Sequence, residues 1–374
     1  MKVLLDATAI PADLGGVGRY VDDLVPELIN AGVNLALAVQ ERDAAHFRAK
    51  APRAHLFPVP GLLTNRGARM AWEQTGLPAL IGRIRPDLLH SPHYTFPALH
   101  RVPVVVTLHD ATFFTHPDAH SRLKRRFFTA AIRRAVRRAD ALVVPSAATR
   151  DETLRFVDGD PARFHIAHHG VDTSTFHPVD DAERERVAAS LGLAGRRYIG
   201  FLGTLEPRKN VPNLIRAWVR AFHDDPDAPA LVLAGGKGWD EEIEPALAEV
   251  PARMTVLRPG YLPLEDLPGF LSGCEILAYP SIAEGFGLPV LEAMACGAAV
   301  LTTRETSLPE VGGDAVAYCG LDASAIARAL VELDAHPQHR AALGAVAQER
   351  ALGEQFTWAA SARAHVQAYE AALA

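Results

Sequence analysis

Short apolar runs alternate along this chain with longer stretches in which apolar residues recur every three or four positions. The runs are typical of strands buried on both faces of a parallel sheet, and the longer period is typical of amphipathic helices. The sequence therefore predicts an α/β fold built from parallel sheets. The predicted strands cover residues 2–6, 34–39, 86–90, 102–110, 141–146 and 165–172 in the first half, and 197–203, 230–236, 254–261, 275–278 and 298–302 in the second.

The length of 374 residues exceeds that of most single hydrophobic cores, which favours two domains. We place them at residues 1–175 and 176–355, followed by an amphipathic helix over residues 356–374. The composition, 49% hydrophobic with a net charge of −6, describes an ordinary globular protein. Three cysteines in apolar segments, no secretory signal and no apolar run of about 20 residues lead us to expect a cytoplasmic protein.

One stretch, residues 278–297, combines the features of a phosphate-binding site. Its apolar strand pattern breaks into Gly285-Phe286-Gly287, and Pro289 then suits the first turn of a helix. Glycines allow a ligand to approach the backbone closely, and the free N–H groups at a helix start favour negative charge. The stretch therefore predicts a strand, a glycine loop and a short helix that together hold a phosphate.

Two carboxylates frame this loop: Glu284 precedes the glycines, and Glu292 lies in the first turns of the helix. A carboxylate accepts two hydrogen bonds from a vicinal diol, so this pair beside a phosphate cradle suits a sugar nucleotide. One acid would hold a ribose and the other a transferred sugar. An alternative interpretation is that Glu292 only complements the helix dipole and that Glu284 is a solvated loop acid.

The stretch 284–297, with both acids, both glycines, the proline and a trailing Ala-Cys-Gly, resembles the E-x7-E signature of the family 4 retaining glycosyltransferases. The resemblance extends over nearly the whole chain. It implies the GT-B fold, in which two Rossmann-like domains with parallel sheets face an interdomain cleft and the C-terminal helix 356–374 packs back on the first domain. In such an enzyme Glu292 would hold the ribose and Glu284 would orient the sugar. The donor phosphate would lie on Phe286, Gly287 and Leu288.

A second candidate for phosphate binding is the turn 204–210, which follows a predicted strand. Arg208 offers a planar fork and Lys209 a point charge, and both suit a pyrophosphate. The segment Gly-Thr-Leu-Glu-Pro-Arg-Lys-Asn resembles the corresponding loop of the family, although many members carry an arginine where this chain has Thr204. The resemblance also implies that Tyr261 and Leu262 border the nucleobase, although Tyr261 is equally compatible with a core position.

In the first half, Gly15 and Gly16 lie between the first predicted strand and a helical pattern, where doubly wound sheets place ligands. Their spacing is not that of the dinucleotide fingerprint, but Glu41 follows the second strand, where a ribose-binding acid would lie, so an NAD-linked enzyme remains an alternative. His109 lies among the polar residues at the end of the strand 102–110, and without the resemblance as a guide, a structural histidine is the plainer interpretation. The resemblance implies that Gly15 and Gly16 line the cleft near the donor phosphate and the acceptor, and that His109 contacts the donor sugar.

Residues 121–139 predict a basic amphipathic helix or helix pair. The segment has an apolar stripe, carries no acid, and contains the basic residues Arg122, Lys124, Arg125, Arg126, Arg133, Arg134, Arg137 and Arg138. Such a surface can lie on anionic lipid, and we hypothesise peripheral membrane contact because enzymes of the resembled kind often act on lipid-linked acceptors. A solvated helix face is the plainer alternative. We disfavour nucleic-acid binding because the rest of the chain is acidic and carries no binding motif.

We expect no metal site. The histidines in strand-end and loop contexts lack the cysteine or acid pattern of a zinc site; they are His90, His93, His116, His120, His165, His168 and His169. Asp158 and Asp160 form an Asp-x-Asp pair, but they precede a proline and are typical of a turn and helix cap.

The sequence thus predicts a retaining glycosyltransferase that moves a hexose from a nucleotide-diphosphate sugar to a glycan or lipid-linked acceptor in surface-polysaccharide assembly. By the resemblance, GDP-mannose is the first donor to test, and no cofactor is required. The expected catalytic residues are Glu284, His109, Arg208 and Lys209. Two rivals are a non-catalytic sugar-nucleotide-binding protein and an NAD-dependent sugar-nucleotide oxidoreductase.

Overall fold

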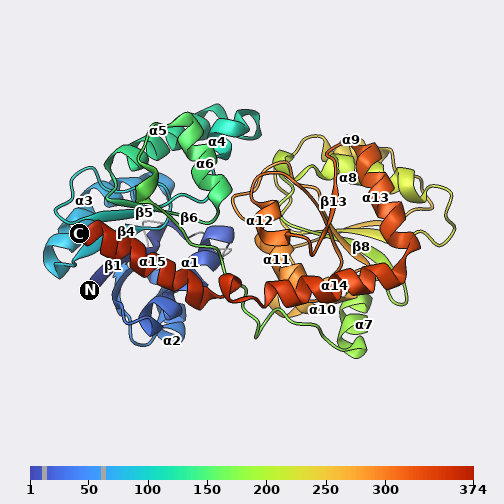
Figure 1. Ribbon diagram of the computed structural model, residues 1–374, viewed down its shortest axis with the longest axis horizontal. Coiled ribbons are helices and arrows are strands. Elements are labelled where there is room, and N and C mark those ends of the chain that lie inside the picture. The colour runs from blue at the N-terminus through green and yellow to red at the C-terminus, as the bar shows by residue number, and fades with distance from the viewer. Residues whose placement is uncertain (11–14, 60–64) are drawn as a thin grey trace. The chain divides into compact units, whose positions relative to one another are not determined.

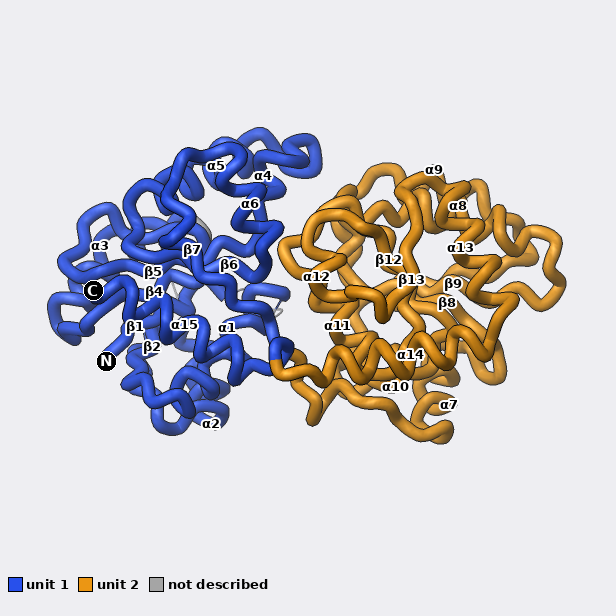
Figure 2. Tube along the Cα trace, viewed as in Figure 1, with its two compact units in different colours: residues 1–170, 355–374 blue, residues 171–354 orange. Residues whose placement is uncertain are grey.

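A computed structural model describes residues 1–10, 15–59 and 65–374. The chain divides into two compact units (Figure 2). Unit 1 comprises Met1–Gly170 and Gln355–Ala374, and unit 2 comprises Val171–Glu354. Each unit contains one parallel sheet with helices on its faces, which confirms the predicted α/β class (Figure 1).

The sheet of unit 1 has seven described strands in the order β3-β2-β1-β4-β5-β6-β7, and every neighbouring pair is parallel. Its strands are β1 (Lys2–Asp6), β2 (Asn34–Gln40), β3 (His55–Val59), β4 (Leu88–Ser91), β5 (Val104–Thr107), β6 (Ala141–Val144) and β7 (Phe164–Ile166). Its helices are α1 (Gly16–Asn30), α2 (Ala44–Lys50), α3 (Arg66–Ile84), α4 (Thr112–Thr115), α5 (Arg122–Arg138), α6 (Ala147–Phe156) and α15 (Trp358–Leu373).

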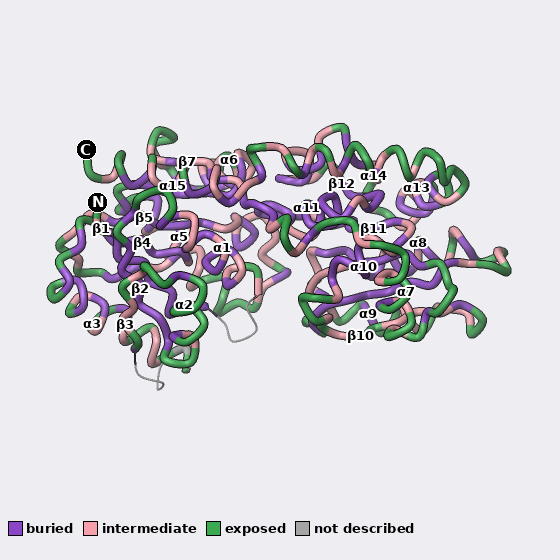
Figure 3. Tube along the Cα trace, turned by 90° about the horizontal axis from the view of Figure 1, so that it is seen from below, coloured by how far each residue is buried: buried purple, intermediate pink, exposed green. Residues whose placement is uncertain are grey.

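Two hydrophobic clusters stabilise unit 1. One packs α1, α2 and the C-terminal helix α15 against the sheet, and the other packs α3 and α5 against it. The strands are apolar on both sides because helices cover both faces, which is why they read in the sequence as continuous apolar runs. Strands β1, β2, β4, β5 and β6 are almost completely buried, whereas the edge strands β3 and β7 are only partly buried (Figure 3).

The sheet of unit 2 has six described strands in the order β10-β9-β8-β11-β12-β13, again all parallel. Its strands are β8 (Tyr198–Leu202), β9 (Ala230–Ala234), β10 (Val256–Gly260), β11 (Ile276–Tyr279), β12 (Val300–Thr303) and β13 (Ala317–Cys319). Its helices are α7 (Asp181–Ser190), α8 (Val211–Phe222), α9 (Ile243–Ala248), α10 (Leu267–Gly273), α11 (Leu288–Ala295), α12 (Leu308–Gly312), α13 (Ala323–Ala335) and α14 (Pro337–Ala351).

Both sheets reverse their strand order once, and this determines where ligands can bind. In unit 1 the reversal lies between β1 and β4, and in unit 2 it lies between β8 and β11. Loops leaving the carboxyl ends of two such strands diverge to opposite faces and leave a crevice, which is the usual binding site of open α/β sheets. Within the described ranges, none of the helices is long and apolar enough to cross a membrane.

Candidate donor-phosphate site in unit 2

The two sequence motifs of unit 2 meet at the reversal of its sheet. The turn Pro207–Lys209 follows β8, and the loop that contains Glu284 follows β11. These strands are parallel neighbours, with Ile276 opposite Ile199 and Leu277 opposite Gly200. Segments separated by about 75 residues in the chain therefore converge at the carboxyl ends of the two central strands, where a ligand is expected.

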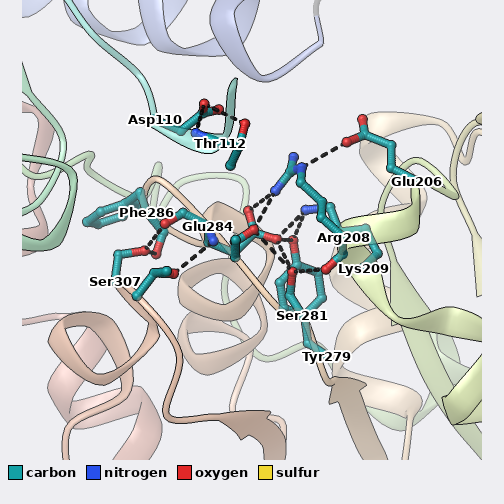
Figure 4. Close-up of polar contacts among 12 residues, drawn as sticks. Asp110, Thr112, Glu206, Arg208, Lys209, Tyr279, Ser281, Glu284, Phe286 and Ser307 are labelled. Carbon is teal, nitrogen blue, oxygen red and sulfur yellow. Dashed lines mark hydrogen bonds and ion pairs between the residues drawn. The ribbon is translucent and has the colours of Figure 1, made fainter. Parts of the chain in front are cut away.

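The Glu284 carboxylate is the centre of this convergence (Figure 4). Its Oε1 accepts hydrogen bonds from Lys209 Nζ at 2.5 Å, Tyr279 Oη at 2.9 Å and Ser281 Oγ at 2.6 Å. Its Oε2 accepts one from Arg208 Nη1 at 2.7 Å. Lys209 is only 5% exposed and Glu284 only 7%, so this is a buried ion-pair cluster. The sequence predicted a sugar-orienting role for Glu284; the structure adds that this acid holds the two cations in place.

The charges in this cluster depend on one another. Burial alone would raise the pKa of Glu284, but Arg208 and Lys209 outweigh it and lower the pKa to about 2, so the group is a carboxylate at neutral pH. Burial, reinforced by Arg208, lowers the pKa of Lys209. Burial and the nearby Glu284 raise the pKa of Tyr279 well above 10, so its hydroxyl keeps its proton and donates it.

A second layer of hydrogen bonds fixes the loop 281–287. The backbone carbonyl of Arg208 accepts a hydrogen bond from the Ile282 N–H at 2.7 Å. The Arg208 side chain donates a second one from Nη1 to the carbonyl of Ala283 at 2.9 Å. The hydroxyl of Ser307, from the segment after β12, lies 2.9 Å from the carbonyls of both Glu284 and Phe286 and shares its single proton between them. The backbone of this loop is therefore set before any ligand arrives.

Helix α11 begins where the sequence predicted a phosphate cradle. Gly287 is its N-cap with φ +106°, a left-handed conformation that favours glycine, and a Cβ there would lie 2.9 Å from Leu308. Leu288 opens the helix, and Phe286 just before it is buried. Glu292 lies in the second turn of α11 and is 1% exposed. The alternative of Glu284 as a solvated loop acid is wrong, since both acids are buried.

The residues predicted to border a nucleobase lie at the carboxyl end of β10. Tyr261 follows this strand directly and is 64% exposed, so it is not a core residue. A Cβ built on Gly236, which follows the neighbouring β9, would lie 2.6 Å from Tyr261 Oη, so the phenol lies against this glycine turn. Leu262 is half-buried beside it. An exposed ring at this end of the sheet can stack on a base, and this role stays a prediction.

His109, from unit 1, follows β5 and is half-buried. Its Nε2 donates to the carbonyl of Pro92 at 2.6 Å. A carbonyl can only accept, so Nε2 carries the proton, and Nδ1 of the neutral ring is an acceptor. Burial lowers the pKa of His109, and the neutral ring therefore persists at neutral pH. A neutral acceptor of this kind suits a sugar hydroxyl.

Gly15 and Gly16 lie at the start of α1, with Gly15 as its N-cap. Among the described residues, a Cβ on Gly16 would meet no atom within 4 Å. The role of these glycines beside the donor phosphate stays a prediction. Glu41, which the NAD alternative would use, lies in a short 3-10 turn after β2.

Sequence reasoning missed Tyr279, Ser281 and Ser307, which complete the cluster around Glu284. All three lie at or just after the ends of the adjacent strands β11 and β12. Polar residues in that position are a recognisable signal, but only once the strand order is known. For metals, the described part of the chain contains no group of three or more His, Cys, Asp or Glu that could hold an ion.

Both halves of the chain match families of glycosyltransferases. Residues 14–175 match the family described as Glycosyltransferase Family 4, and residues 183–350 match Glycosyl transferases group 1. The chain is 30% identical over 335 residues to the O-antigen chain mannosyltransferase B of Escherichia coli, covering 84% of this chain and 85% of that protein. It is 27% identical over 376 residues to the GDP-mannose-dependent alpha-(1-6)-phosphatidylinositol monomannoside mannosyltransferase of Mycolicibacterium smegmatis, covering 95% of both.

Solved structures agree on the fold. Anabaena HepE in complex with UDP and glucose superposes with a TM-score of 0.76 at 18% identity, covering 99% of both chains. Sucrose-phosphate synthase of Thermosynechococcus elongatus gives a TM-score of 0.79 at 21% identity, covering 99% of this chain and 98% of that one. The chain therefore belongs to the family 4 glycosyltransferases and has their GT-B fold of two Rossmann-like domains.

Proposed function

We propose that this protein is a retaining mannosyltransferase that transfers mannose from GDP-mannose to a glycan or lipid-linked acceptor of a surface polysaccharide. Two relatives support the choice of sugar, because both are named as mannosyltransferases and one as GDP-mannose-dependent. The relatives give the oxidoreductase alternative no support. The observation that carries the proposal is the cation pair beside the start of α11, made of the half-buried Arg208 and the buried Lys209.

The chemistry follows from where charge develops. Cleavage of the bond between the sugar and the diphosphate leaves negative charge on the departing phosphate and makes the sugar oxocarbenium-like. Arg208, Lys209 and the N–H groups at the start of α11 stabilise the leaving charge, and such preorganised stabilisation is usually the largest catalytic term. These groups supply the positive charge that a metal would otherwise bring, so we propose that the donor binds without one.

We infer retention of the sugar's configuration from the family, because among the described residues no side chain is an obvious nucleophile for the sugar carbon. We infer attack on the front face, in which the acceptor oxygen bonds to the sugar carbon on the side from which the diphosphate leaves. The acceptor proton passes to the departing phosphate oxygen. We propose that His109 accepts a hydrogen bond from the sugar through Nδ1, because Nε2 is paired with the Pro92 carbonyl, and that Glu284 orients the sugar.

The experiment that tests the function is a nucleotide-release assay with GDP-mannose, run beside thermal-shift measurements with GDP, UDP and NAD. We expect GDP to raise the melting temperature more than UDP, NAD to have no effect, and GDP release to persist in excess EDTA. GDP binding without release would identify the non-catalytic alternative. A shift with UDP alone would replace mannose by a UDP-linked sugar, and loss of release with EDTA would contradict metal independence.

Glu292→Gln is expected to raise the KM for GDP-mannose about 10-fold with a smaller change in kcat. The substitution keeps the shape of a side chain that is 1% exposed but removes the carboxylate that would accept from both ribose hydroxyls. Such a contact holds the substrate and the transition state alike, so its loss weakens binding more than turnover. Steady-state kinetics measure this, with Glu310→Gln on α12 as the control; equal KM values for both variants would contradict the ribose role.

The basic helix α5 supports a membrane-facing role for unit 1. Its inner face, Ile132, Ala135 and Val136, packs against the sheet. Arg134 is not part of the surface that we predicted, because it donates to the carbonyls of Phe96 and Pro97 at 3.0 and 2.8 Å. The exposed cluster is the first turn, where Leu123, 81% exposed, lies among four cations: Arg122, Lys124, Arg125 and Arg126. We propose that this turn rests on anionic lipid at the inner face of the membrane.

Replacing these four cations by glutamine is expected to weaken binding to vesicles of anionic phospholipid roughly a thousand-fold. Each basic residue near the headgroups contributes about 1 kcal/mol, and the four contributions add for separate side chains. Flotation measures the bound fraction, with zwitterionic vesicles and high salt as controls that should abolish binding of the wild-type protein. Flotation of wild type that stays negative with anionic lipid would refute the membrane role.

A further inference from the structure

A buried polar cluster in unit 1 has no part in the function proposed so far. It contains two histidines, two tyrosines and a threonine, none more than 1% exposed, in a unit whose core is otherwise largely apolar. His90 lies on β4, Thr107 on β5 and Tyr20 on α1; His365 and Tyr369 lie on α15. Buried polar groups are costly unless they are fully paired, so this concentration requires a specific reason.

These five side chains form one continuous chain of hydrogen bonds. Tyr369 Oη lies 2.9 Å from His90 Nδ1, and His90 Nε2 lies 2.9 Å from Thr107 Oγ1. Thr107 Oγ1 lies 3.0 Å from Tyr20 Oη, and Tyr20 Oη lies 2.6 Å from His365 Nε2. The chain ends where His365 Nδ1 lies 2.7 Å from the carbonyl of Ser361.

The Ser361 carbonyl fixes the direction of every bond. A carbonyl only accepts, so His365 Nδ1 carries a proton, and Nε2 of the neutral ring accepts from the Tyr20 hydroxyl. Because the Tyr20 hydroxyl donates its only proton to His365 in this hydrogen bond, its oxygen accepts a hydrogen bond from Thr107. Thr107 in turn accepts from His90 Nε2–H, which leaves His90 Nδ1 to accept from Tyr369. All five hydrogen bonds therefore run in the same donor-to-acceptor direction, which the Ser361 carbonyl oxygen determines.

Both imidazoles must be neutral for the chain to have this direction. A second proton on His365 would place an N–H against the Tyr20 hydroxyl, and the chain would then run in the opposite direction: Tyr20 would donate to Thr107, Thr107 to His90 Nε2, and His90 Nδ1–H to Tyr369. The surroundings favour neutrality: burial lowers the pKa of His365 to about 4, with further repulsion from His109 and His165. Burial, with repulsion from His365 and His109, also lowers the pKa of His90 well below its ordinary value.

The chain joins the C-terminal helix to the two segments of unit 1 that carry site residues. Tyr20 lies one turn after Gly16 at the start of α1, and Thr107 lies two residues before His109 at the end of β5. The rings of Tyr20 and His109 also form a T-shaped contact, with centroids 5.1 Å apart and planes at 82°. A shift of Tyr20 would therefore move the imidazole that faces the sugar.

We propose that Tyr20, held by His365 of α15, is a positioning residue for His109, so that docking of the C-terminal helix sets the geometry of the sugar-binding histidine. This inference rests on the proposed function, in which His109 contacts the donor sugar. Tyr20 touches neither donor nor acceptor in this role; it acts through the ring that it contacts. The competing explanation is that the chain only stabilises the fold of unit 1.

The direction of the chain is tested without any donor. In protein labelled with 15N-histidine, long-range 1H–15N correlation spectra at neutral pH are expected to show His365 with its proton on Nδ1 and His90 with its proton on Nε2. Single His365→Gln and His90→Gln variants assign the signals. The opposite tautomer of either ring, or a charged ring at neutral pH, would overturn the proposal.

The positioning role is tested with Tyr20→Phe and a matched control, Tyr198→Phe. Tyr198 is also fully buried and donates one hydrogen bond, to the carbonyl of Phe270 at 2.7 Å, but it lies at the start of β8 in unit 2. We expect Tyr20→Phe to lower kcat for GDP-mannose about 10-fold with KM within about 2-fold, because the nucleotide contacts of unit 2 are unchanged. Tyr198→Phe should lower the melting temperature by a similar amount and leave kcat unchanged.

The His109 signals separate this inference from the proposed function. Tyr20→Phe is expected to shift the ring resonances of His109, and Tyr198→Phe is not. Equal kcat values for both variants, or an unmoved His109, would show that the chain is only structural. If the wild-type protein does not turn over GDP-mannose at all, the proposed function fails. The histidine tautomers and the His109 ring resonances are measured without any donor, so they still decide whether Tyr20 positions this histidine.

Discussion

Lys209→Met is expected to lower the turnover of GDP-mannose at least about 100-fold while the protein stays folded. The ammonium group lies 2.5 Å from Glu284 in a buried site, where a positive charge stabilises a leaving diphosphate far more than it would in water. Removing one such preorganised donor typically costs 10²- to 10³-fold, that is about 3–4 kcal/mol. Methionine keeps the length and volume of the side chain but removes the ammonium group, which lies 4.8 Å from the centre of the Tyr279 ring. Nucleotide release and the melting temperature are the two measurements.

A double variant separates catalysis from structure. In Lys209→Met/Glu284→Gln one cation and one anion leave the cluster together, so no charge is left newly unpaired in the interior. If Lys209 binds the diphosphate, stability recovers in the double variant but its turnover stays far below that of Glu284→Gln alone. If Lys209 only neutralises Glu284, the double variant and Glu284→Gln turn over GDP-mannose at the same rate. Arg216→Ala, which removes a surface cation paired with Glu249 in the same unit, should leave both properties near wild type.

The strands of both sheets could be predicted because each is buried on two faces. Runs such as 102–110 and 230–236 contain β5 and β9, and the observed strands are shorter because the polar ends of these runs leave the sheet as loops. Those ends are the functional part: His109 and the glycine turn beside Tyr261 follow the last paired residues. Element type and approximate position were therefore available from the apolar pattern alone.

The contact between Lys209 and Glu284, in contrast, could not be predicted from the apolar pattern. Apolar patterns give strands but not their neighbours, and β8 pairs with β11 although β9 and β10 lie between them in the chain. The resemblance to family 4 suggested that both motifs serve one ligand, but not that Glu284 bonds to both cations. That contact depends on the register of β8 with β11, which no local pattern specifies.

The C-terminal helix contains buried polar residues that sequence patterns do not predict. Its amphipathic pattern was visible and includes Tyr369, yet His365 counts as polar in such a pattern although it is fully buried. His365 is paired with Tyr20 of α1, and the Tyr369 hydroxyl with His90 of β4. Only tertiary structure shows these pairings, so the apolar period alone does not predict a buried histidine at this position.

Glu284→Gln is expected to reduce the free energy of unfolding by about 3–5 kcal/mol, the cost of removing one partner of a buried ion pair. The amide still accepts hydrogen bonds, but Arg208 and Lys209 lose the charge that offsets their burial. Urea denaturation measures the loss, and hydrogen exchange of peptides from β8 and β11 localises it. Glu249→Gln, from an ion pair whose acid is half-exposed, is the matched control and should cost less than about 1 kcal/mol. Equal losses would contradict the structural role of Glu284.

The stability difference between wild type and Glu284→Gln is expected to narrow as the pH falls. The pKa of Glu284 is lowered from 4.5 to about 2 in the folded protein, so its carboxylate contributes stability above pH 4.5 and loses it between 4.5 and 2. The full contribution corresponds to roughly 3 kcal/mol, of which about 1 is lost by pH 3.5. Lys209 does not add to this slope, because acid keeps it protonated throughout the window. Urea midpoints of both proteins at intervals from pH 6 to 3.5 measure the narrowing, and a constant difference would show that Glu284 does not titrate as an ion-paired carboxylate.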